Sequence, residues 1–259
     1  MAWITGRPLA LLRCPNGIAG ETFFQKHAWR GLSPHIVQVQ DPKDPTGEPL
    51  IAIEDLDGLM GLVQSAALEI HPWGATIADW EHPDMITMDL DPGEAVEWPA
   101  VVAAARELRQ RLEDHGLAGF VKTSGGKGLH VVAPLRPLAE WPAVKSFTKT
   151  LAEAMAADDP DRYVSTIGKA RRRGRILIDY LRNQRGATAV AAYSTRARPG
   201  AAVSAPLRWE ELDAGIGPAW FTIRNMPTRL ATLASDPWDG FRSAAAPLEA
   251  PRARRRKAG

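Results

Sequence analysis

The sequence contains very little cysteine: Cys14 is the one thiol among 259 residues. A single cysteine can form neither an intrachain disulfide framework nor a cysteine-based zinc site, so both are excluded. The chain also lacks an apolar run of the roughly 18 residues that a membrane-spanning helix requires. Its N-terminal stretch has no basic n-region and no small-residue cleavage site, so no signal peptide is expected.

There is also little net charge, because 32 Lys and Arg stand against 30 Asp and Glu, a balance of +2. Taken as a whole, this sum argues against a strongly basic nucleic-acid binder. Hydrophobic residues make up 45% of the chain and charged residues 24%, values typical of folded globular proteins. This composition excludes a chain that is disordered over its whole length. The length predicts one large domain or two small ones.

The near balance hides two segments of opposite sign. From Asp79 to Glu97 there are seven carboxylates and no Lys or Arg. From Tyr163 to Arg208 there are ten Lys and Arg and a single acid, Asp179. We call these segments the carboxylate block and the arginine block, and we look for the functional site in them.

Hydrophobic periodicity and turn residues predict an α+β fold with a mostly antiparallel central sheet or sheets flanked by helices. One domain is expected over residues 1–242, followed by a flexible basic tail over 243–259. The expected helices span 54–67, 99–117, 141–157 and 227–234, and the expected strands span 9–13, 36–39, 50–53, 68–70, 85–90, 119–123, 129–133, 175–181 and 187–193.

Three acids in these strands are candidate metal ligands. Asp89 and Asp91 are two residues apart at the end of an apolar strand, so their side chains point to the same face. Two adjacent carboxylates repel each other unless a cation lies between them, and hard oxygen ligands suit Mg²⁺ or Mn²⁺. The other interpretation is a surface turn at the sequence DPG. Asp179 ends a second apolar run and needs either a metal or an ion pair with a neighbouring arginine.

A glycine-rich turn, Ser124-Gly125-Gly126-Lys127-Gly128, lies between two expected strands and precedes His130. It fails the Walker pattern, because glycine follows Lys127 and a strand follows the turn. Its backbone N–H groups, together with Ser124, Lys127 and His130, still suit a polyphosphate. A simple hairpin turn is the alternative.

Two further features suit nucleic acid. The basic run Lys169-Ala170-Arg171-Arg172-Arg173-Gly174-Arg175 could contact phosphates or form a solvated charged face. The aromatic pair Phe23 and Phe24, followed by Lys26, could stack on bases or belong to a core edge.

Together these motifs resemble a known family. The DLD pair, the glycine-rich turn with its histidine, and the later aspartate occur in the order of the three motifs of the archaeo-eukaryotic primase superfamily. Longer stretches such as MDLDPGEAVEW, VKTSGGKGLHVVAPL and FTIRNMPTRL are similar to the polymerase domain of bacterial ATP-dependent ligase D, the non-homologous end-joining enzyme. The resemblance runs from about Gly6 to about Asp239.

The resemblance implies that 1–242 is a primase-polymerase catalytic domain: a template-dependent nucleotidyltransferase that fills gaps or extends ends during double-strand break repair. It implies Mn²⁺ or Mg²⁺ as two divalent cations, NTP or dNTP as substrate with a taste for ribonucleotides, and a cytoplasmic, nucleoid-associated place. The implied roles are metal binding by Asp89, Asp91 and Asp179, nucleotide binding by His71, Ser124, Lys127, His130, Arg172 and Arg196, and DNA binding by Phe23, Phe24 and Lys26.

The implied partners are gapped DNA ends with a 5′-phosphate, a Ku-type end-binding protein and a DNA ligase domain or protein, with no membrane. Family members usually carry a helical segment before the stretch that begins at Gly6, and this chain apparently lacks it. In the family that segment contributes basic residues to the pocket for the downstream 5′-phosphate, so its absence would remove part of that pocket.

Two other function classes use the same features. A non-catalytic DNA-end binding or bridging module would need the basic residues, but it gains nothing from three acids beside DNA phosphates. A metal-dependent nuclease would use the acids, but it does not explain the phosphate-type turn.

Overall fold

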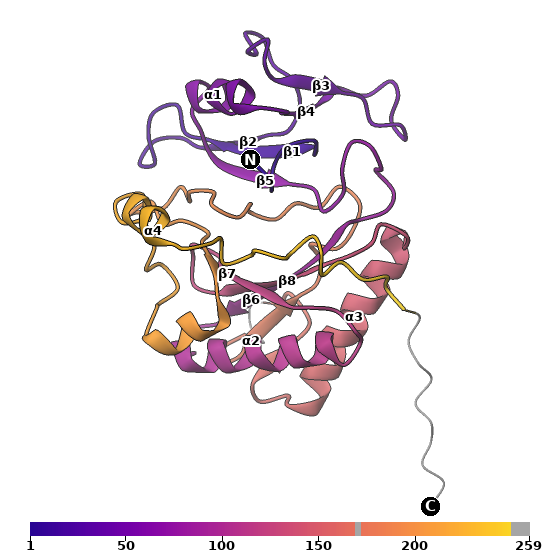
Figure 1. The fold of residues 1–259 in the computed structure, drawn as a ribbon, viewed down its shortest axis with the longest axis vertical. Coiled ribbons are helices and arrows are strands. Elements are labelled where there is room, and N and C mark those ends of the chain that lie inside the picture. Colours follow the sequence, from indigo (N-terminus) through magenta and orange to yellow (C-terminus); the bar gives the residue numbers. More distant parts are fainter. Residues whose placement is uncertain (169–171, 250–259) are drawn as a thin grey trace, which may run out of the picture.

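Two β-sheets organise the residues that this computed structural model describes, 1–168 and 172–249. The N-terminal sheet and helix α1 form one layer, and the larger second sheet, covered by α2 and α3, forms the other (Figure 1). The N-terminal layer contains β1 (Leu9–Arg13), β2 (Phe23–Gln25), β3 (Val37–Val39), β4 (Leu50–Ala52), α1 (Leu56–Gln64) and β5 (Ala67–Pro72). The second layer contains β6 (Met85–Pro92), α2 (Trp98–Glu113), β7 (Phe120–Thr123), β8 (Leu129–Pro134), α3 (Trp141–Asp158), β9 (Tyr163–Val164), β10 (Ile176–Asp179), β11 (Pro206–Leu207) and α4 (Met226–Thr232).

Strand β6 lies inside the second sheet, whose order is β11-β7-β8-β6-β10-β9. All neighbouring pairs are antiparallel except β10 and β9, which are parallel. The N-terminal sheet runs β2-β1-β4-β3, with β5 antiparallel to β1. The expected α+β class with mostly antiparallel sheets is therefore confirmed.

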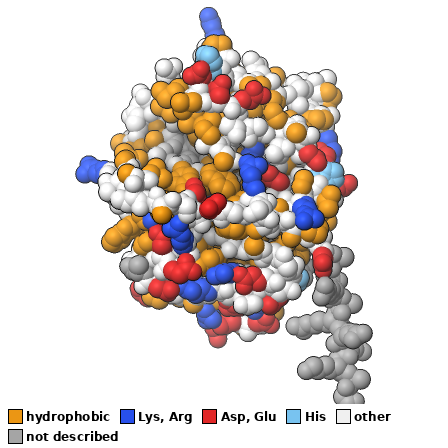
Figure 2. All heavy atoms as spheres, in the orientation of Figure 1, with side chains coloured by type: hydrophobic (Ala, Val, Ile, Leu, Met, Phe, Trp, Pro, Cys, Tyr) orange, Lys and Arg blue, Asp and Glu red, His pale blue; other side chains and the backbone are white. Residues whose placement is uncertain are grey.

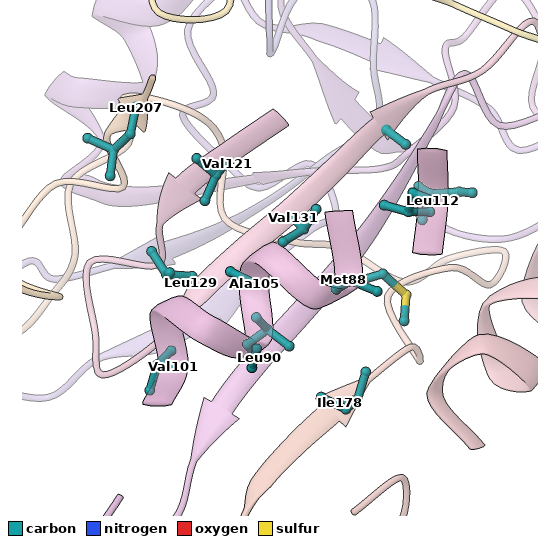
Figure 3. Close-up of a cluster of buried hydrophobic side chains, with 14 of the residues drawn as sticks. Met88, Leu90, Val101, Ala105, Leu112, Val121, Leu129, Val131, Ile178 and Leu207 are labelled. Carbon is teal, nitrogen blue, oxygen red and sulfur yellow. The ribbon is translucent and has the colours of Figure 1, made fainter. Parts of the chain in front are cut away.

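The main core lies between the second sheet and α2. Met88 and Leu90 of β6 are fully buried there, on the side where Val101 and Ala105 of α2 also lie (Figure 3). Because side chains alternate across a strand, Asp89 and Asp91 point to the opposite face of the sheet. One strand thus contributes to the apolar core and to the polar face that carries the site.

The expectation of a strand over 187–193 is wrong. This segment makes an isolated bridge between Thr188 and Trp73 and otherwise belongs to no ladder. Its amide at Ala191 donates to Ile70 in the N-terminal layer (2.9 Å), while its carbonyl at Val190 accepts from Lys122 in the second sheet (2.9 Å). The segment therefore connects the two layers, a role that its apolar composition does not distinguish from that of a strand.

Among the elements of residues 1–168 and 172–249, four short ones were not predicted: β2, β9, β11 and a 3₁₀ helix over Trp209–Ala214. Residues 243–249 also differ from the expected flexible tail. Arg136 donates its amide to the Ala246 carbonyl (2.9 Å), and Leu248 packs against the main core, so these residues belong to the packed body. The rest of the expected tail, 250–259, lies outside the described residues. Within 1–168 and 172–249, no helix is long and apolar enough to cross a membrane.

The side chain of Asn183 closes the sheet where β10 ends. Its amide oxygen accepts from the Thr87 N–H (2.8 Å), and its amide nitrogen donates to the Thr87 (2.8 Å) and Tyr180 (2.9 Å) carbonyls. Asn183 is 1% exposed, so water cannot replace these bonds. The side chain thus satisfies the backbone N–H and C=O groups of Thr87 in β6, as the backbone of a longer β10 would do.

We expect Asn183→Ala to lower the free energy of unfolding by about 2–3 kcal/mol, because it leaves the buried Thr87 N–H and C=O unsatisfied. Urea denaturation monitored by circular dichroism measures the change. Gln184→Ala serves as the matched control, since Gln184 makes only a part-buried contact with Lys145, and we expect it to cost well under 1 kcal/mol. Equal stability losses in the two variants would contradict the assignment.

Candidate functional site

A cavity of about 370 Å³ receives side chains from both layers. It brings together seven of the predicted site residues. They come from β5, from β6, from the glycine-rich turn with β8, and from the arginine block. These are His71, Asp89, Asp91, Ser124, Lys127, His130 and Arg196. Arg182, Arg198 and residues 188–190 complete the wall.

The three predicted carboxylates lie on two paired strands. Asp179 of β10 lies opposite Asp89 of β6 in the ladder, and Asp91 follows on the same face. Arg182 bridges the first two, with its Nη2 atom 3.6 Å from an Asp89 oxygen and 3.5 Å from an Asp179 oxygen. Arg172 donates from Nη1 to Asp91 at 2.9 Å.

These ion pairs bear on the alternatives that the sequence left open for the three acids. The salt-bridge alternative for Asp179 describes the structure, and Asp91 is also paired with an arginine. Among the described residues, no group of three His, Cys, Asp or Glu side chains is arranged to hold a metal ion. In this arrangement an oxygen of Asp91 is taken up by Arg172 and is not shared with Asp89 and Asp179.

The environment of Asp89 nevertheless suits a cation. Burial, together with the charges of Asp179 and Asp91, raises the pKa of its carboxyl to about 6, although the charge of Arg182 acts in the opposite direction. A divalent cation beside Asp89 and Asp179 would remove this penalty, and hard carboxylate oxygens are suitable ligands for Mg²⁺ or Mn²⁺. The donor set thus fits the expected metal through Asp89 and Asp179.

The glycine-rich turn is built to approach other backbone closely. Gly125 has a left-handed φ of +63°, and a Cβ added at Gly128 would lie 1.9 Å from the Leu90 carbonyl oxygen. The Ser124 hydroxyl accepts from the amides of Gly126 (3.2 Å) and Gly128 (3.3 Å), so its own hydrogen stays available to a ligand. Lys127 is exposed at the mouth of the cavity.

Behind the turn, Lys122, His130 and Asp89 lie side by side on β7, β8 and β6. Burial lowers the pKa of Lys122 to about 7. Its Nζ donates to the Val190 carbonyl (2.9 Å) and to the Ser204 hydroxyl (2.6 Å). Lys122 therefore fixes the inter-layer segment that lines the cavity.

His130 is buried and carries an unused polar atom. Burial lowers its pKa well below the usual value, and the charges of Lys122, Arg182 and Arg196 act in the same direction. Its Nε2 lies 3.4 Å from Asp89, while its buried Nδ1 has no partner among the described residues. A buried ring nitrogen without a partner at the cavity wall marks a place for a ligand.

Sequence reasoning missed Glu69, which joins two predicted residues. Its Oε2 lies 2.8 Å from His71 Nε2 and 3.0 Å from Arg196 Nε, and its Oε1 accepts from the Ala197 amide (2.8 Å). Arg196 also donates to the Ser124 carbonyl at 2.6 Å. The i, i+2 spacing of Glu69 and His71 on a strand was the available signal.

The predicted DNA-binding residues lie outside this cavity, with Phe23 and Phe24 on β2 and Lys26 directly after it. Phe24 is 66% exposed, and its ring meets the edge of the His71 ring at 5.7 Å between centroids. Phe23 is 40% exposed and lies under the guanidinium of Arg13 (5.3 Å). Phe24 and Lys26 line a second hollow of about 390 Å³, and Thr188 lines both cavities. The two hollows are therefore neighbours.

The carboxylate and arginine blocks meet across this region. Besides the pairs at Asp89 and Asp91, Arg185 contacts Glu81 at 2.8 Å. On the face shown in Figure 2, basic and acidic side chains are interspersed, and neither sign forms a broad patch. Of the predicted basic run, residues 169–171 lie outside the described residues.

Comparisons with known proteins agree on one family. A family model described as the LigD primase-polymerase domain matches residues 1–238. The chain is 44% identical over 236 residues to the multifunctional non-homologous end joining protein LigD of Pseudomonas aeruginosa, covering 91% of this chain and 28% of that protein. It is 31% identical over 244 residues to the bifunctional LigD of Bacillus subtilis, covering 94% and 39%.

A solved structure is also similar. The polymerase domain from Mycobacterium tuberculosis Ligase D in complex with DNA superposes with a TM-score of 0.84 at 29% identity, covering 93% of this chain and 86% of that one. The chain spans 28% and 39% of the length of the two curated relatives above.

The raised pKa of Asp89 predicts a stability cost that depends on pH. Between about pH 3.8 and pH 6 the folded carboxyl keeps a proton that the unfolded chain has released, so stability falls as pH rises through this window. Without divalent cations, we expect Asp89→Asn to be more stable than wild type by about 2–3 kcal/mol at pH 7.5 and equally stable below pH 4.

Urea denaturation at the two pH values measures this difference, and Asp161→Asn, which alters an exposed acid, is the matched control. A variant no more stable than wild type at pH 7.5 would show that burial does not strain the Asp89 carboxylate.

Proposed function

The chain belongs to the family of LigD primase-polymerase domains, and from this premise we propose that it is a template-dependent nucleotidyltransferase of DNA end joining. It would fill gaps or extend ends at double-strand breaks, with a preference for ribonucleotides. The relatives named above are end-joining proteins, and the similar solved domain is in complex with DNA. Its place would be the bacterial cytoplasm, beside the nucleoid.

One observation carries the proposal: a single cavity combines ionisable carboxylates with a glycine-rich, cationic wall. Asp89 and Asp91 line it together with Ser124, Lys127 and Arg196. A module that only binds DNA would place no acids beside phosphates, since they weaken phosphate binding. A nucleotidyl transfer site needs both signs, because its acids would hold divalent cations and its basic groups would hold the triphosphate.

In the proposed reaction, the 3′-hydroxyl of a primer attacks the α-phosphorus of a bound nucleoside triphosphate. The new phosphodiester bond forms as the bond between the α-phosphorus and the oxygen that joins it to the β-phosphate breaks. Pyrophosphate leaves with the bonding electrons, and the proton of the 3′-hydroxyl passes to solvent. Ser124, Lys127 and Arg196 would hold the β- and γ-phosphates, where the leaving group gains negative charge. His130 also lines this cavity.

Asp89, Asp179 and Asp91, once freed from Arg172, would hold divalent cations, which lower the pKa of an attacking hydroxyl and neutralise phosphate charge when bound. Arg172, released from Asp91, becomes available to the triphosphate, in line with its predicted nucleotide-binding role. Arg182 now fills the space between Asp89 and Asp179, so it too would turn toward phosphate as metal enters.

The template would run over β2. Phe24 offers a mostly exposed ring next to His71 of the cavity, and stacking of a base on an aromatic ring tolerates any sequence. Lys26 lines the neighbouring hollow, within reach of a backbone phosphate. A Ku-type protein would bring the domain to broken ends, and a ligase domain or protein would seal the product.

We expect Asp89→Ala to reduce extension of a gapped, primed duplex by at least about 1000-fold while the protein stays folded, because the variant loses a cation ligand. Extension with ribo- and deoxyribonucleotides, with and without Mn²⁺, measures the loss and reports the preferred sugar. Asp161→Ala should extend at the wild-type rate.

The same variant distinguishes the proposed function from a non-catalytic DNA-binding module and from a nuclease. Binding of the gapped duplex in a gel-shift assay should survive the substitution. Wild-type extension by Asp89→Ala would refute the metal assignment, and cleavage of labelled DNA in Mn²⁺ without nucleotide would indicate a nuclease.

A further inference from the structure

Glu69 is a buried acid next to a site for a polyanion, where an isolated carboxylate would weaken binding. Its side chain is 3% exposed. Burial acts to raise its pKa, but hydrogen bonds from His71 and the Ala197 amide, with the charge of Arg196, outweigh burial and lower the pKa to about 2. Glu69 is therefore a carboxylate at neutral pH, and an ionised carboxylate can only accept hydrogen bonds.

This acceptor determines which nitrogen of His71 carries the proton. His71 Nε2 lies 2.8 Å from Glu69 Oε2, so Nε2 must be the donor. The other nitrogen, Nδ1, makes no hydrogen bond to any residue in 1–168 or 172–249. The Nδ1 atom of His130 is fully buried and has no partner, whereas the Nδ1 atom of His71 is not among such buried atoms. His71 also lines the main cavity.

The surroundings of His71 favour the neutral ring. Burial is the largest influence and lowers its pKa, the charges of Arg196 and Lys122 act in the same direction, and Glu69 opposes them. The ring of Phe24, which packs against its edge, carries no charge. A neutral ring with its proton on Nε2 presents an unprotonated Nδ1, which accepts a hydrogen bond and cannot donate one.

We propose that Glu69 is a positioning residue that fixes His71 as a hydrogen-bond acceptor for a sugar hydroxyl of the incoming nucleotide. The inference rests on the proposed function. It differs from a role for His71 in phosphate binding, because phosphate oxygens of a nucleotide carry no hydrogen at neutral pH and would be repelled by the Nδ1 lone pair.

Position and chemistry both select the sugar. His71 and Arg196 contact the same oxygen of Glu69, and Arg196 also holds the Ser124 carbonyl of the turn. The acceptor thus lies directly beside the phosphate-binding groups, where the sugar of a nucleotide follows its phosphates. The bases also carry donors, but these differ between bases, whereas the sugar hydroxyl is common to all four substrates of a templated enzyme.

The tautomer can be observed without any ligand. In long-range ¹H–¹⁵N correlation spectra of the protein at pH 7.5, we expect His71 to show a protonated Nε2 and an unprotonated Nδ1. Glu69→Ala should convert this single form into a mixture or the opposite tautomer. A wild-type His71 that is protonated on Nδ1 overturns the proposal, whatever the protein binds.

Ligand binding tests the role of the acceptor. Dissociation constants for ATP, 2′-deoxyATP, 3′-deoxyATP and inorganic tripolyphosphate, each with Mg²⁺, are measured by titration calorimetry. For wild type, loss of the recognised hydroxyl should weaken binding about 5- to 10-fold relative to ATP, and the analogue affected identifies which hydroxyl it is.

His71→Phe should weaken ATP by the same factor, abolish the difference between ATP and that analogue, and leave tripolyphosphate unchanged. Arg196→Met is the matched control: it should weaken all four ligands together and keep the ratio between ATP and the analogue. Circular dichroism confirms that each variant is folded.

Retention of the wild-type ratio in His71→Phe, or equal weakening of ATP and tripolyphosphate, overturns the proposal in favour of a phosphate contact. Absence of binding of all four ligands by wild type refutes the proposed function instead, and the tautomer measurement distinguishes that failure from an error about Glu69.

Discussion

The two-residue period of strand β6 is the constraint on which the site depends. Met88 and Leu90 are fully buried against α2, while Asp89 and Asp91 point to the cavity. A shift of one residue in the register with β8 or β10 would place carboxylates in the apolar core, at a cost of several kcal/mol each. The hydrophobic core therefore holds the acids in place.

Burying acids side by side at the cavity costs free energy of folding, and basic residues elsewhere in the chain reduce this cost. Asp89 is destabilised as a carboxylate by burial and by its neighbours, and Arg182 offsets this only in part. The arginines that pair with the acids come from one later segment, so the near-zero net charge reflects two opposed blocks that meet in space. The arginines pair with these acids in this structure, and a cation beside the acids would relieve the repulsion that the arginines leave.

Buried ionisable groups around the cavity act mainly by fixing geometry. Lys122 holds the segment that joins the two layers, and Glu69 holds His71 and Arg196. Each makes several short contacts with little access to water, so its partners have few alternative positions. The parts of the cavity wall that Lys122 and Glu69 hold are therefore already fixed in this structure, which would lower the ordering cost of binding a ligand there.

The sequence predicted the fold class, most regular elements, the acids and the glycine-rich turn with His130, because strand alternation and turn chemistry are local properties, and it indicated His71 only through the family resemblance. It did not reveal Glu69, whose partners Arg196 and Ala197 are more than 120 residues away, and it gave 187–193 as a strand. It also left open which arginines pair with which acids. These points became clear in the folded protein, since the groups that hold a buried charge, or an extended segment between two layers, come from chain segments that meet only on folding.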